Sequence, residues 1–120
     1  MIKSYEDLEV WQLAMNATER VYSMTRTFPH EERFVLSQQL RRAVISVPLN
    51  IAEGHSRGGQ REFRRYLDIA LGSLAEVETC LVLAERLGFI EKVRPELAEC
   101  LDALGRKLRT LQKAVNSQIK

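Results

Sequence analysis

Residues 39–54 read QLRRAVISVPLNIAEG, and this stretch decides the fold. It has the character of the second half of a long helix. Between Ala43 and Ala52 it is apolar almost all the way round, and a helix that is apolar on all sides is buried on all sides. Pro48 lies inside it, where it removes one backbone donor and collides with the carbonyl of Val44, at a cost of about 3 kcal/mol. We therefore expect this helix to be buried against more than one neighbour.

Four polar residues recur along the same stretch. They are spaced i, i+4, i+8 and i+11, which places them on one helical face: Arg42, Ser46, Asn50 and Glu53. A buried polar group without a partner costs about 1–3 kcal/mol. We therefore expect this polar ladder to bond within itself or to neighbouring helices.

The chain before this stretch predicts one complete helix and the first half of a second. The first helix begins near Ser4, which can form a capping box, and ends at Phe28-Pro29, because the residue before a proline avoids helical geometry. The second opens after Pro29 with two acids in its first turn, and Gly54 suits the left-handed position after its end. Its apolar side carries Phe34, Leu36, Leu40, Val44, Val47 and Ile51.

Two more helices follow. The third covers residues 60–87 and stops at Gly88, with a heptad-like seam of Phe63, Leu67, Ala70, Leu74, Val77, Leu81 and Ala84. Gly72 and Ser73 in its middle are poor helix formers, which suggests that another backbone comes close. Pro95 fits the first turn of the fourth, whose apolar side repeats at 4-3 spacing: Leu97, Leu101, Leu104, Leu108, Leu111 and Val115.

These patterns predict an all-α protein, an antiparallel up-down-up-down four-helix bundle in which residues 1–120 form one domain. The 45% hydrophobic and 28% charged content is typical of soluble helical proteins. No apolar run is long enough to cross a membrane, and the N-terminus lacks the apolar core of a signal peptide. Two cysteines do not make a disulfide framework, so we expect a cytoplasmic protein.

The net charge of +2 does not by itself indicate nucleic acid, but the arginines are clustered. Arg57, Arg61, Arg64 and Arg65 fall within nine residues, and Arg41 and Arg42 precede them. A nucleic-acid footprint and an ordinary solvated face are both compatible with such a cluster. The two interpretations differ in whether the six arginines converge on one open surface or are each paired with acids.

Other chemistries have weaker support. The chain has only two histidines and no E-x-x-H motif, so we expect no metal or other cofactor. The segment from Gly54 to Gly59 has P-loop spacing but follows a helix and lacks the lysine, which excludes nucleotide hydrolysis. The same glycine-rich segment is about equally compatible with a phosphate held at the start of the third helix and with a plain glycine turn. Cys80 and Cys100 fit buried free thiols better than a redox pair.

Three stretches resemble a known bacterial family. They are YEDLEVWQ at 5–12, QLRRAVISVPLNIAEG at 39–54 and YLDIALGSLAEVE at 66–78. They are similar to the four-helix-bundle proteins encoded by intervening sequences of 23S rRNA genes, also named S23-type proteins, a family that includes the accessory variability protein of diversity-generating retroelements. The resemblance implies a cytosolic, ring-shaped homopentamer without established catalysis. It also implies RNA or DNA, and a reverse transcriptase, as candidate partners.

The leading functional hypothesis is a non-enzymatic homopentamer that binds nucleic acid, RNA in particular, through Arg41, Arg42, Arg57, Arg61, Arg64 and Arg65. The alternative is a protein-interaction scaffold without a nucleic-acid partner.

Overall fold

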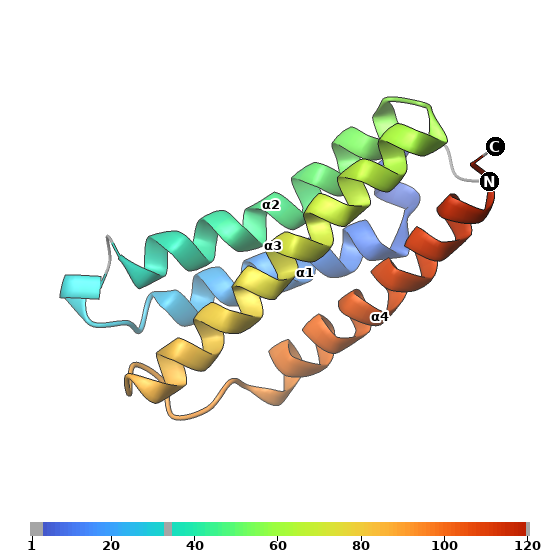
Figure 1. Cartoon of the computed structure of the whole chain (residues 1–120). Helices are drawn as coiled ribbons and strands as arrows, with labels where there is room; N and C mark the ends of the chain where they lie inside the picture. Colours follow the sequence, from blue (N-terminus) through green and yellow to red (C-terminus); the bar gives the residue numbers. More distant parts are fainter. Residues whose placement is uncertain (1–3, 33–34, 120) are drawn as a thin grey trace.

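The computed structural model describes residues 4–32 and 35–119, and every regular element in these ranges is helical. Four long helices form the molecule: α1 (Glu9–Thr25), α2 (Leu36–Ser56), α3 (Gln60–Arg86) and α4 (Pro95–Ser117). Two single 3-10 turns, η1 (Tyr5–Asp7) and η2 (His30–Glu32), precede α1 and α2. The long helices lie side by side in a body of 48 × 25 × 22 Å (Figure 1).

Each long helix contacts two others. The most extensive contact joins α2 to α3, while α1 packs on α2 and α4, and α4 also packs on α3. The interface between α2 and α3 pairs Ser46 with Ser73 near the middle and Glu53 with Tyr66 at one end, so these two helices run in opposite directions.

The core consists of the apolar sides of the four helices. The predicted seams of α3 and α4 are confirmed, except that Phe63 and Leu111 are only partly buried. The largest fully buried side chains come from all four helices: Val21, Leu40, Val44, Val47, Ile51, Leu67, Leu74, Val77, Leu104 and Leu108. Pro95 occupies the first turn of α4 as predicted, and Gly88, with a φ of 79°, follows the end of α3.

The predicted limits of the first two helices are partly wrong. Ser4 forms its capping box, but the box caps the short turn η1, because Leu8 then adopts an extended conformation that separates η1 from α1. Helix α1 ends at Thr25, and α2 begins at Leu36 instead of directly after Pro29. Phe34, assigned above to the apolar side of the second helix, lies outside the described residues.

Gly54 has a different role from the predicted one. It does not end α2, which continues to Ser56; it lies inside the helix and is buried. A Cβ atom placed on Gly54 would lie 2.6 Å from the Cβ of Tyr66, closer than real Cβ atoms come. Glycine is therefore needed here for the close packing of α2 on α3, whereas Gly58, with a φ of 84°, supplies the left-handed turn.

Pro48 is buried within α2, as the sequence predicted, and the structure explains how it is accommodated. A proline at this position cannot donate to the carbonyl of Val44, one turn earlier. The hydroxyl of Thr18 in α1 lies 2.8 Å from the carbonyl oxygen of Ala14 and 3.3 Å from that of Val44. The hydroxyl has one hydrogen and lies closer to Ala14, so a donor from the neighbouring helix replaces the missing backbone donor of α2 only in part.

Candidate interaction surfaces

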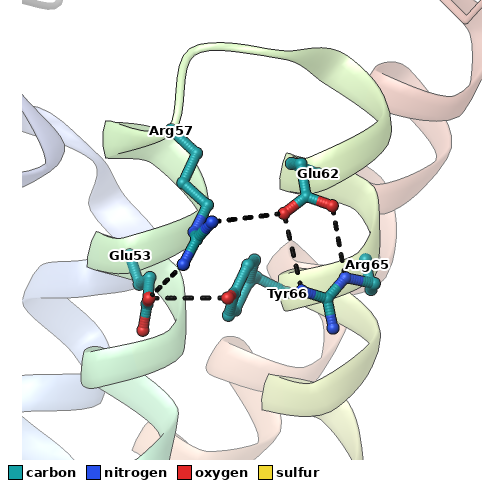
Figure 2. Close-up of polar contacts among 5 residues, drawn as sticks. All are labelled: Glu53, Arg57, Glu62, Arg65 and Tyr66. Carbon is teal, nitrogen blue, oxygen red and sulfur yellow. Dashed lines mark hydrogen bonds and ion pairs between the residues drawn. The ribbon is translucent and has the colours of Figure 1, made fainter.

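The arginines around the end of α2 and the start of α3 are paired with acids (Figure 2). Arg57 donates to Glu53 at 2.9 Å and lies 3.8 Å from Glu62, which also accepts from Arg65 at 3.3 Å. Tyr66 donates to Glu53, and the guanidinium groups of Arg57 and Arg65 both lie over its ring. The hydrogen bond that Arg57 donates to Glu53 raises the pKa of Arg57, and the one that Arg65 donates to Glu62 raises the pKa of Arg65.

Arg64 faces the opposite side of α3. Its guanidinium donates to Asp68 at 3.0 Å and to Asn116, which ties α3 to the end of α4. Arg61 is exposed and also has an interaction partner. The four arginines of residues 57–65 therefore lie at one end of the molecule, but acids neutralise three of them.

Arg41 and Arg42 do not belong to this cluster. Arg41 precedes Arg57 by 16 residues of α2, which is about 24 Å along the axis. Its Nε donates to the hydroxyl of Thr25 at 2.8 Å, and its guanidinium lies 4.7 Å from the centre of the Tyr22 ring. Arg42 is exposed and forms no ion pair with the described residues. The six arginines do not converge on one surface.

The polar ladder of α2 is divided between two sets of contacts. The amide of Asn50 donates to the hydroxyl of Ser46 at 2.9 Å and to its carbonyl at 2.7 Å, and Ser46 bonds to Ser73 of α3 at 2.7 Å. Glu53 belongs instead to the arginine cluster. Arg42 shares no hydrogen bond with the other three within the part of the chain that the structure describes.

An apolar groove lies between α1 and α2. It has a volume of about 370 Å³ and is lined by Tyr5, Trp11, Met15, Thr18, Ile45, Pro48, Leu49 and Ala52. Leu49 at its edge is 61% exposed, so the prediction that residues 43–52 are buried on all sides is wrong for the single chain. An apolar groove with an exposed leucine is typical of an interaction site.

Exposed apolar side chains also lie along one side of α3, interrupted by the exposed Glu76. Ile69, Leu83 and Leu87 are all at least 40% exposed, and their spacing places them on one side of the chain with Gly72. Among the described residues, no atom outside the neighbouring turns of α3 lies within 4 Å of a Cβ built on Gly72, so the prediction that another backbone approaches Gly72 is wrong within one chain. The gap leaves room for a close approach from outside.

The described residues carry little sign of catalytic chemistry. Among them, no group of three or more histidine, cysteine, aspartate or glutamate residues could hold a metal ion. Burial raises the pKa of both thiols, Cys80 and Cys100, and Cys100 donates to the carbonyl of Leu13 at 3.4 Å. Within the described ranges, no helix is long and apolar enough to cross a membrane.

Sequence reasoning missed the residues that hold the arginines. Thr25, Tyr22 and Asn116 come from other helices than the arginines they contact, so no local pattern connects them. Only pairs within one helix, such as Arg57 with Glu53 and Arg64 with Asp68, could have been found from their i, i+4 spacing.

Comparisons with known proteins place the chain in a family. No curated protein matches it. The chain is similar to a solved crystal structure from Bacteroides thetaiotaomicron, described as a protein of unknown function from the S23 ribosomal protein family. The two share 26% sequence identity with a TM-score of 0.63, over 92% of this chain and 98% of the other. Residues 6–114 match the family described as 23S rRNA-intervening sequence protein, and the chain therefore belongs to that family.

Proposed function

We propose that this protein is a non-enzymatic, self-assembling scaffold whose subunits form an up-down-up-down four-helix bundle. The observation that carries the proposal is the 61% exposure of Leu49, at the edge of the apolar groove between α1 and α2. Together with the apolar side chains that line the groove, Leu49 forms an exposed apolar patch, and such patches mark sites of association. The arginines give less support to a nucleic-acid site, because they are distributed over two ends of α2 and three of them are paired with acids.

The proposed occupant of the groove is the α3 surface of a second copy. Leu83 and Leu87 would supply apolar side chains, and the open flank of Gly72 would let the helices approach closely. Because the groove and the α3 surface are different patches, the contact is head-to-tail, and head-to-tail contacts close into rings. The ring of five is the form that the family resemblance implies.

Light scattering on the purified protein tests the proposal. The expected mass is near five times the chain mass of 13.8 kDa. Leu49→Glu places a charge in the groove and should give monomers, as should Leu83→Glu on the α3 surface. Gln38→Glu, which adds the same charge at another exposed position of α2, is the control and should still form the ring.

Mixing the two variants distinguishes a head-to-tail contact from a symmetric one. The Leu49→Glu chain keeps its α3 surface and the Leu83→Glu chain keeps its groove, so one intact interface per pair remains. The mixture should form heterodimers and no larger species. A wild-type monomer at micromolar concentration, or variants that still form rings, would contradict the proposal.

Nucleic-acid binding through the same assembly is the second candidate. The ion pairs of Arg57, Arg64 and Arg65 are exposed, and exposed pairs are weak enough to exchange for phosphates. A ring would repeat Arg57, Arg61, Arg64 and Arg65 once per subunit, and binding should then weaken steeply with salt.

Titration of structured RNA and duplex DNA at low and moderate salt tests this second candidate. Arg61→Glu combined with Arg64→Glu should abolish binding. Glu62→Gln, which releases Arg65 and leaves Arg57 paired with Glu53 alone, should strengthen it. A wild type that binds neither nucleic acid at low salt leaves only the protein scaffold.

A further inference from the structure

A polar pocket lies beside the first turn of α2, at the end of the molecule away from the arginine cluster. It has a volume of about 510 Å³ and is lined by Thr25, Arg26, Phe28, Pro29, Ser37 and Arg41. Two of these residues are arginines, two carry hydroxyl groups and none is acidic. Among the described residues, the lining of the pocket therefore combines two positive charges with no carboxylate.

The two arginines of the pocket are not paired with acids within the described ranges. Arg26 and Arg41 form no ion pair with the residues that the structure describes, in contrast to Arg57, Arg64 and Arg65. Arg41 is held in place by its bond to Thr25 and by the ring of Tyr22. The Thr25 bond uses only its Nε, so the two terminal amino groups of the guanidinium stay available to a ligand.

Ser37 supplies an independent observation. It is only 3% exposed, and in the described structure its hydroxyl is the one buried side-chain oxygen or nitrogen without a hydrogen-bond partner. A buried hydroxyl without a partner is costly, and because Ser37 belongs to the pocket lining, a ligand that reached its hydroxyl would remove this cost.

The start of α2 adds to the same environment. No side chain caps this helix, so the backbone amides of its first turn are not used by a cap. The positive end of a 21-residue helix favours an anion near Ser37. Helix start, hydroxyl and guanidinium groups together offer hydrogen-bond donors from several directions, which suits a tetrahedral oxyanion better than a planar carboxylate.

We propose that the pocket formed by Arg26, Arg41 and Ser37 at the start of α2 is a binding site for a phosphate group. The site lies within one chain and is independent of the assembly and of the nucleic-acid candidate described above. The phosphate is either free inorganic phosphate or the terminal phosphate of a nucleotide, since both present the same oxygen atoms.

Calorimetric titration of the full chain with inorganic phosphate at constant ionic strength is the first test. The wild type should bind one phosphate per chain. Arg41→Gln should weaken binding at least about tenfold, because it removes hydrogen bonds to a charged group. Arg42→Gln, a change of the neighbouring exposed arginine, is the matched control and should bind as the wild type does.

Ser37→Ala gives a second test that does not depend on the arginines. Without phosphate this variant should melt at the same or a higher temperature than the wild type, because it removes a hydroxyl that has no partner. With phosphate, its rise in melting temperature should be smaller than that of the wild type. Phosphate also stabilises proteins by exclusion from their surface, so only the difference between variants is informative.

Adenosine 5′-monophosphate and adenosine distinguish the two sources of the phosphate. Binding of the nucleotide but not of the nucleoside would identify a phosphomonoester site, and binding of inorganic phosphate alone would identify a site for the free anion. The proposal is overturned if wild type, Arg41→Gln and Ser37→Ala respond equally to phosphate, or if the wild type shows no saturable binding.

Discussion

The two ends of α2 both carry arginines, but they hold them in different ways. At the C-terminal end, Arg57 is exposed and shares Glu53 and Glu62 with its neighbours (Figure 2). At the N-terminal end, Arg41 bonds to Thr25 of α1 and lines a pocket whose described residues include no acid. Arginines that have acids close to them in sequence are therefore neutralised locally. Arginines brought together by the fold can keep their positive charge available to a ligand.

The difference between the two ends extends to packing. At the C-terminal end, α2 and α3 lie so close at Gly54 that no side chain fits between them. At the N-terminal end the neighbouring segments leave space for the pocket. We therefore expect the C-terminal end of α2 to contribute more to the stability of the fold, and the N-terminal end to be suited to binding a ligand.

The largest expected effect concerns Gly54. Gly54→Ala would place a Cβ 2.6 Å from the Cβ of Tyr66, so the two helices must separate. Overpacking of this kind costs about 1–3 kcal/mol, and the higher helix propensity of alanine offsets only part of it. Urea denaturation in the Leu49→Glu background measures the loss. Gly72→Ala, the control at an open position of α3, should be neutral or stabilising, and equal losses would contradict the packing explanation.

A smaller effect is expected for the arginines themselves. Arg41→Ala removes the bond to Thr25 and the contact with Tyr22, and should lower the free energy of unfolding by about 1–2 kcal/mol. Arg57→Ala removes exposed ion pairs, which water screens, and a longer contact with the ring of Tyr66 at 5.2 Å, and should change stability less than Arg41→Ala does. Denaturation of both variants under the same conditions checks the contrast. Similar losses in the free energy of unfolding would mean that the arginines at the two ends of α2 contribute equally to stability.

The smallest expected effect concerns pH. Burial, followed by the charge of Glu76, raises the pKa of Cys80, which lines a shallow pocket with Gln39 near the N-terminal end of α2. The unfolded chain therefore loses this proton at a lower pH than the folded one. The resulting stability is fully present below the unfolded pKa of a cysteine, about 8.5, and is lost as pH rises from there through the higher folded pKa. Cys80→Ala should show a shallower decline than the wild type over this range in denaturation experiments.

The helices could be predicted from the sequence because their signals are local. Pro95, Gly88 and the apolar seams of α3 and α4 act through neighbours in the same helix, and these predictions are confirmed. Gly54 was misassigned because a glycine near a helix end is compatible with both a left-handed turn and a close helix contact. Only the position of Tyr66, on another helix, decides between them.

The candidate sites were less predictable for the same reason. The arginine cluster at residues 57–65 is visible in the sequence, but its interhelical partner Asn116 is not. The phosphate pocket combines Arg26 from the segment after α1 with Ser37 and Arg41 from α2, and no sequence spacing marks this combination. The exposure of Leu49 depends on which side of α2 its neighbours cover, which periodicity does not determine in an almost entirely apolar stretch.

The contact between Pro48 and Thr18 has a consequence for how the chain folds. Helix α2 alone leaves the carbonyl of Val44 without its usual donor, and Thr18 of α1 provides one only when the two helices are already together. We therefore expect the middle of α2 to become fully helical as α1 docks, so that both helices form in a single kinetic step. Thr18→Val should then slow refolding as well as accelerate unfolding, which would place the α1–α2 hairpin in the transition state.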